Sequence, residues 1–175
     1  MRKLALLAIT LPLTMPLAAL EISSPDIQEG QRMAKTFEYS GFGCDGENQS
    51  PALAWKDAPA GTKSFAITVY DPDAPTGSGW WHWLALNIPA DTKSLPRGAS
   101  GKLDKVLETR TDYGQPGFGG ACPPVGHGMH RYQFTIWALP DEKLDFPVDI
   151  SPAIVGYTLN SKALAKATLT ATYVR

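Results

Sequence analysis

The chain has 175 residues and nearly balanced charge, with 16 Lys and Arg against 17 Asp and Glu and a formal net charge of −1. Nucleic-acid surfaces need clustered basic side chains to contact phosphates, and the sequence has no such cluster, so its charge argues against nucleic-acid binding. A chain of this length predicts one domain with a single core.

The first 19 residues are predicted to be a secretory signal peptide. Arg2 and Lys3 precede an apolar run that two prolines interrupt and that ends in small residues. The run is shorter than the roughly 20 continuous apolar residues that cross a bilayer, so no stable membrane insertion is expected. Cleavage after Ala19 would leave residues 20–175 as a single domain in the periplasm or outside the cell.

The only two cysteines are Cys44 and Cys122. An exported chain meets an oxidising compartment, so the sequence favours a disulfide between them, with two separate buried thiols as the alternative. The stretch GFGCDG around Cys44 has the letters of a dinucleotide-binding fingerprint. Pro51 prevents the helix that this motif needs, so no nucleotide cofactor is predicted.

Four segments of apolar residues are predicted to be strands. SFAITVY at 64–70 alternates and ends at an Asp-Pro, and WWHWLALNI at 80–88 is apolar on both faces, which is typical of a strand between two layers. In this strand, a period of two places His82 on the face of Leu84 and Leu86. HRYQFTIWAL at 130–139 and ATLTATYV at 167–174 alternate in the same way.

The other segments predict a helix and a long loop. Ser151 followed by Pro152 is typical of a helix start, which indicates a helix over SPAIVGYTLNSKALA, 151–165. Residues 91–129 are rich in Gly and Pro and are predicted to form a functional loop.

Polar side chains that could bind a ligand or take part in a reaction lie near the ends of these strands. Asp71 and Asp73 follow the first strand, and His82 lies among tryptophans in the second. The third strand begins at His130, with Tyr132 on the same face. The histidines lack the close spacing of metal ligands, so no metal site is predicted. The sequence also lacks the Gly-x-Ser-x-Gly motif of many hydrolases.

These residues suit a small anionic ligand. A carboxylate next to an imidazole favours the protonated ring, which contacts anions well in a partly dry pocket. Asp71 is therefore expected to orient His82 or His130. The prolines in 71–75 and 123–124 would hold the rims rigid, and the tryptophans beside His82 would form apolar walls. The set contains no evident nucleophile.

At these residues the sequence resembles the phosphatidylethanolamine-binding protein family, also called the Raf kinase inhibitor protein family. The resemblance rests on DPDAP at 71–75, WWHWLALN at 80–87 and PPVGHGMHRY at 123–132, and it extends over essentially the whole mature chain. Within the family, the sequence is most similar to the bacterial YbhB/YbcL branch, and to exported members of that branch with paired cysteines.

The resemblance implies a mainly β fold: a β-sandwich with a large central antiparallel sheet, a smaller sheet and a short helix near the C-terminus. It also implies a pocket for phosphate or a phosphoethanolamine head group. Matched motif to motif, the ligand-binding residues would be Asp71, Asp73, Trp81, His82, Pro124, His130 and Tyr132. Trp83 is an alternative to Trp81, and His127, which has no counterpart in the family motif, is assigned only a rim position.

Three hypotheses for function follow. The leading one is a non-enzymatic exported protein that binds small anionic groups, such as phosphate or phosphoethanolamine, without a cofactor. The alternative is an inhibitor or docking protein for a partner such as a protease, a kinase or a host factor, which would use segment 91–129. A weak phosphoester hydrolase with His82 or His130 as the base ranks last. The resemblance to this branch also suggests a homodimer.

Overall fold

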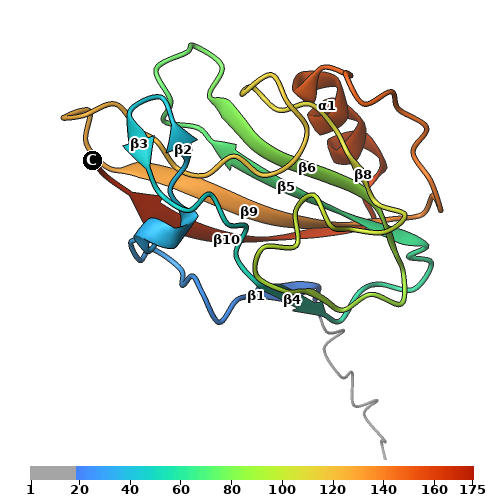
Figure 1. The fold of residues 1–175 in the computed structure, drawn as a ribbon. Helices are drawn as coiled ribbons and strands as arrows, with labels where there is room; N and C mark the ends of the chain where they lie inside the picture. Colours follow the sequence, from blue (N-terminus) through green and yellow to red (C-terminus); the bar gives the residue numbers. More distant parts are fainter. Residues whose placement is uncertain (1–18) are drawn as a thin grey trace, which may run out of the picture.

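The computed structural model describes residues 19–175, so the predicted signal peptide, except for Ala19, lies outside the described residues. Five antiparallel strands form the main sheet, in the order β10-β9-β5-β6-β8 (Figure 1). These strands are β5 (Ser64–Asp71), β6 (Trp80–Pro89), β8 (Leu107–Glu108), β9 (His130–Leu139) and β10 (Ala165–Tyr173). The four longer strands confirm the four strands predicted from the sequence.

Smaller elements complete the sandwich. A three-stranded sheet has the order β1-β4-β7, and β2 and β3 form a separate hairpin. The elements are β1 (Glu21–Ser23), the 3-10 turn η1 (Lys35–Phe37), β2 (Ser40–Gly41), β3 (Cys44–Asp45), β4 (Leu53–Lys56) and β7 (Ser94–Leu95). The predicted loop at 91–129 therefore contains the two short strands β7 and β8. The large sheet, the smaller sheet and one helix confirm the predicted mainly β fold.

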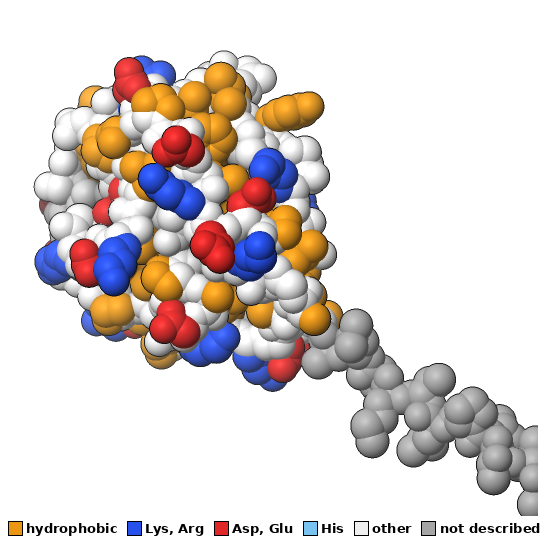
Figure 2. Space-filling model, turned by 90° about the vertical axis from the view of Figure 1, so that its right-hand side faces the viewer, with side chains coloured by type: hydrophobic (Ala, Val, Ile, Leu, Met, Phe, Trp, Pro, Cys, Tyr) orange, Lys and Arg blue, Asp and Glu red, His pale blue; other side chains and the backbone are white. Residues whose placement is uncertain are grey.

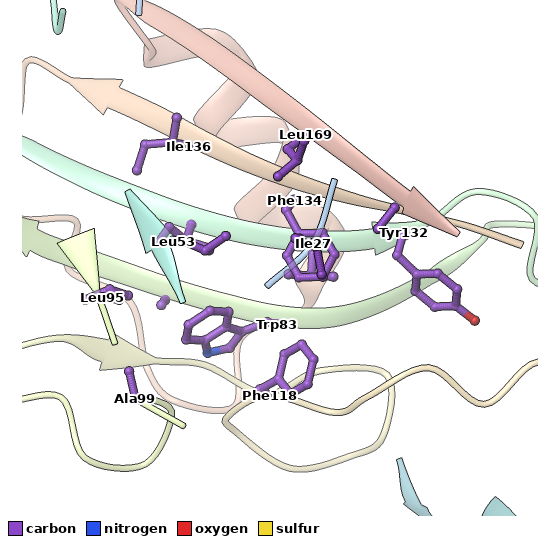
Figure 3. Close-up of a cluster of buried hydrophobic side chains, with 14 of the residues drawn as sticks. Ile27, Leu53, Trp83, Leu95, Ala99, Phe118, Tyr132, Phe134, Ile136 and Leu169 are labelled. Carbon is purple, nitrogen blue, oxygen red and sulfur yellow. The ribbon is translucent and has the colours of Figure 1, made fainter. Parts of the chain in front are cut away.

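Two apolar clusters cover the two faces of the main sheet. The larger lies between this sheet and β1-β4-β7, and includes Trp83, Phe134 and Leu53 (Figure 3). The smaller cluster lies under helix α1 (Pro152–Lys162) and includes Leu84 and Leu86. Because each fully buried large apolar side chain contributes roughly 1.5–3 kcal/mol, this two-sided burial explains why the central strands are apolar on both faces.

Helix α1 begins where the sequence predicts and ends earlier. Ser151 has the extended backbone of an N-cap residue, although its side chain makes no capping hydrogen bond, and Pro152 opens the helix. The helix ends at Lys162 because Ala163 is extended, and β10 begins at Ala165. The predicted helix over 151–165 is therefore three residues too long at its C-terminal end.

Strand β6 contains two irregularities that the sequence did not reveal. Tyr70 pairs with Trp81 and Val69 pairs with Trp83, so His82 is an extra residue in β6. A bulge of this kind turns the following side chains to the other face of the sheet. His82 consequently shares its face with Tyr132, and its predicted position on the face of Leu84 and Leu86 is wrong.

The second irregularity lies further along β6. Phe65 pairs with Ile88 and Ile67 with Ala85, so two residues of β6 oppose one of β5. Asn87 takes a positive φ of 62° there, and its amide exchanges hydrogen bonds with the backbone of Leu144. These two buried bonds hold the segment before α1 against the sheet.

The face of the molecule shown in Figure 2 carries both positive and negative side chains. Figure 2 shows acidic and basic side chains interspersed with apolar ones on one face. Within residues 19–175, no helix is long and apolar enough to cross a membrane.

Candidate functional site

A cavity of about 200 Å³ opens where β5, β6 and β9 meet their adjoining loops. The sheet residues that line it are Asp71, Trp80, His82, His130 and Tyr132. The loops contribute Phe42, residues 74–76, Tyr113 and residues 122–124. The volume is below the roughly 300–1,000 Å³ of pockets for drug-sized ligands, so the cavity suits a small chemical group.

Three side chains form a hydrogen-bonded chain at one wall of the cavity. Asp71 Oδ2 lies 2.7 Å from Nδ1 of His130, and Nε2 of His130 lies 2.7 Å from Nδ1 of His127. Asp71 and His130 are 2% and 1% exposed, whereas His127 is exposed. An ionised carboxylate only accepts hydrogen bonds, so Nδ1 of His130 carries a hydrogen and Asp71 holds the ring in one orientation. Of the two histidines that Asp71 was expected to orient, it contacts His130.

His82 is held by a different group. It is 3% exposed, and its Nδ1 donates to the backbone oxygen of Gly119 over 2.7 Å. Burial lowers the pKa of His82 from 6.5 to about 4, an effect that the bond to Gly119 partly opposes. The His82 ring is therefore neutral near pH 7, unlike the protonated ring that the sequence suggested for this pocket.

Two side chains that line the cavity each carry a buried donor group with no hydrogen-bond partner within residues 19–175. The donor groups are the hydroxyl of Tyr132 and the indole N–H of Trp80. Burial raises the pKa of Tyr132 well above its usual value, so the hydroxyl keeps its hydrogen. Figure 3 shows the ring of Tyr132 at the end of the core cluster, with its hydroxyl pointing away from the other labelled side chains. A ligand that accepts from these donors would relieve a cost of roughly 1–3 kcal/mol each.

The structure brings five of the seven predicted ligand-binding residues to the cavity and places two elsewhere. Asp71, His82, Pro124, His130 and Tyr132 line the cavity, whereas Asp73 and Trp81 do not. Asp73 forms an ion pair with Arg131 and also accepts from its backbone N–H. Arg131 lowers the pKa of Asp73, so this carboxylate stays ionised and anchors the start of β9.

Trp81 points to the opposite face of the sheet. Its ring lies 4.6 Å from that of Tyr70 and fills the space beside Gly156 of α1, where a Cβ would come within 2.9 Å of it. Its neighbour Trp80 lines the cavity instead. Trp83, the alternative, is in the main core, where its indole donates to Glu108. Of the tryptophans around His82, the residues that line the cavity therefore include Trp80 and neither Trp81 nor Trp83.

Sequence reasoning also missed Tyr113 and Phe42. Tyr113 lies in the long loop and donates its hydroxyl to the backbone oxygen of Gly120, which places its ring beside that of His82. Phe42 occupies the two-residue turn between β2 and β3 with a φ of 53°, a conformation that is rare for a bulky residue. A tyrosine and a phenylalanine in loops carry no spacing signal that could have indicated these positions.

A disulfide joins Cys44 of β3 to Cys122, which itself lines the cavity. It ties the β2-β3 hairpin to the segment before β9, and the two lie side by side in Figure 1. Buried Glu38 links the hairpin to β10 as well, because it accepts from the backbone N–H of Asp45 and from the hydroxyl of Tyr173. These links hold Phe42, which is 71% exposed, at the edge of the cavity.

Two lining residues with reactive side-chain types are engaged in other interactions. Cys122 is in a disulfide, and the hydroxyl of Thr76 donates to the backbone oxygen of Gly79. Among residues 19–175, no cluster of three or more His, Cys, Asp or Glu side chains could hold a metal ion. The cavity thus offers fixed donors and acceptors to a ligand.

Comparison with known proteins places these features in context. Residues 23–174 match the family described as phosphatidylethanolamine-binding protein. Protein YbcL of Escherichia coli (strain K12) is 50% identical over 161 residues, which cover 89% of this chain and 88% of YbcL. Protein YbhB of the same organism is 49% identical over 158 residues, which cover 88% of this chain and 99% of YbhB.

The fold agrees with a solved relative. The crystal structure of E. coli YbcL, described as a new member of the mammalian PEBP family, superposes with a TM-score of 0.88. That match has 47% sequence identity and covers 90% of this chain and 99% of YbcL. The similarity therefore extends over most of the chain.

Proposed function

Because this chain belongs to the phosphatidylethanolamine-binding protein family, we propose that it is a non-enzymatic binding protein whose cavity takes a small anionic group, such as phosphate or the phosphoethanolamine head group. One observation carries the proposal. Tyr132 and Trp80, whose side chains each carry a buried unpartnered donor, line the same small cavity as the Asp71–His130 pair.

The physical basis is the hydrogen-bonding capacity of an oxyanion. Each oxygen of a phosphate group accepts more than one hydrogen bond, and bonds to a charged acceptor are roughly twice as strong as those between neutral groups. Tyr132 and Trp80 provide such donors away from water, where they act more strongly. Pro123 and Pro124 form a rigid part of the wall, which reduces the entropy lost on binding.

We expect saturable binding of phosphate and of O-phosphoethanolamine to the oxidised mature protein, measured by isothermal titration calorimetry. Tyr132→Phe removes one donor and should weaken binding about tenfold. Tyr157→Phe is the matched control, because Tyr157 is exposed on α1, and it should bind as wild type does.

Absence of saturable binding in the folded wild-type protein would contradict the proposal. Docking to a partner protein would then become the leading function. The side chains that would favour it are Phe42, Val125 and Met129, three exposed apolar residues of the β2-β3 turn and the loop before β9.

We also propose that the protein is exported to the periplasm or secreted, with residues 1–19 removed as a signal peptide. The Arg2-Lys3 start and the apolar run support this, and so does the disulfide, which needs an oxidising compartment. Intact mass of the purified mature protein should place Leu20 at its N-terminus. Retention of residues 1–19 in that protein would contradict the assignment.

A further inference from the structure

The two ring nitrogens of His82 have separate environments. Nδ1 faces the backbone oxygen of Gly119, and a carbonyl oxygen only accepts, so Nδ1 carries the ring hydrogen. In a neutral imidazole the other nitrogen, Nε2, is then an acceptor. The low pKa of His82, about 4, supports a neutral ring at physiological pH.

Nε2 of His82 has no hydrogen-bond donor among the described residues. The ring contacts Tyr113 and Tyr132 edge-on, with centroids 5.5 Å and 5.1 Å away. The hydroxyl of Tyr113 donates to Gly120, and that of Tyr132 has no partner in residues 19–175, so neither reaches Nε2. Since His82 lines the cavity, its free acceptor is available to a ligand.

Asp71 is a second acceptor at the same cavity. Its two carboxylate oxygens accept from Nδ1 of His130 at 2.7 Å and from the backbone N–H of Asp73 at 2.8 Å. It contributes negative charge beside the ligand position, and it has no hydrogen to offer. An anion made only of acceptor oxygens would therefore meet a lone pair at His82 and a carboxylate at Asp71, together with the donors of Tyr132 and Trp80.

We propose that the cavity selects tetrahedral oxyanions that carry a hydrogen, and that His82 recognises this hydrogen through Nε2. The ligand class is hydrogenphosphate and singly protonated phosphomonoesters, which include O-phosphoethanolamine only in its singly protonated form. The cavity discriminates against sulfate, which has the same shape but no hydrogen. This inference rests on the proposed anion-binding function. In the complex, the ligand O–H donates to Nε2 of His82, while its other oxygens accept from Tyr132 and Trp80.

The test compares anions of equal shape and charge. At pH 8, hydrogenphosphate and sulfate both carry two negative charges, and arsenate and selenate form a second pair that differs in the same hydrogen. In calorimetric titrations of the oxidised wild-type protein, phosphate and arsenate should bind on the order of tenfold to a hundredfold more tightly than sulfate and selenate, since a buried acceptor left unpaired costs this much.

The variant His82→Asn tests whether His82 causes the preference for phosphate over sulfate. The amide of His82→Asn can donate to Gly119 as Nδ1 does, but the side chain is too short to place an acceptor at Nε2. It should lose on the order of tenfold to a hundredfold in phosphate affinity, keep its sulfate affinity and so bind the two anions nearly equally. A retained preference in the folded variant would overturn the role of His82.

The wild-type measurement decides the proposal even if the variant does not fold. Equal affinity of wild type for phosphate and sulfate would overturn the selectivity and leave the anion-binding function standing. No binding of any of the four anions would instead contradict the proposed function itself.

Discussion

Reduction of the Cys44–Cys122 disulfide is expected to lower the free energy of unfolding by about 4 kcal/mol. The two cysteines are 78 residues apart, and cross-linking so long a loop strongly restricts the unfolded chain. In the folded protein the reduced hairpin would keep other links to distant segments, such as the hydrogen bond from Arg175 to the backbone oxygen of Gly43. Loss of the disulfide therefore acts mainly on the unfolded state.

Urea unfolding with and without a reductant measures this effect. The double variant Cys44→Ser/Cys122→Ser is the control, and its stability should match reduced wild type and not respond to reductant. Since Cys122 lines the cavity and the disulfide positions Phe42, phosphate affinity should also fall on reduction. An unchanged urea midpoint on reduction would mean that the bridge does not stabilise the protein.

Acidification from pH 6.5 to pH 4 is expected to remove about 3 kcal/mol of stability through His82 alone. Its pKa falls from 6.5 in a solvated chain to about 4 in the fold, because burial disfavours the charged ring. Between these values the unfolded chain takes up a proton that the folded protein does not, so protonation favours unfolding. The contribution of the neutral His82 ring to the free energy of unfolding is complete above pH 6.5 and is lost as the pH falls toward 4.

Unfolding free energies of wild type and His82→Asn at several pH values between 4 and 7 test this prediction. The variant lacks the titrating ring, and the groups that the two proteins share cancel in the comparison. The stability advantage of wild type over the variant should shrink steadily as the pH falls. Parallel stability curves would show that His82 is not the buried neutral group that the structure indicates.

Much of this protein follows from its sequence because its main signals are local. Alternation of apolar residues predicts β5, β9 and β10, since side chains on a strand point to opposite faces with a period of two, and a short run that is apolar on both faces predicts β6. Ser151 and Pro152 predict the start of α1 for an equally local reason. His130 and Tyr132 could be placed on one face because β9 is regular along its length.

The tertiary structure alone decided how the cavity is lined. A bulge at His82 depends on how β6 pairs with β5, and this pairing moved His82 to the cavity face and exchanged Trp81 for Trp80. Phe42 reaches the cavity only because the hairpin is tied to a segment far along the chain. Contacts between distant segments leave no periodic trace in the sequence, whereas strands and helix ends do. The sequence therefore determined the sheet and the chemical type of the site, and packing determined which side chains face the ligand.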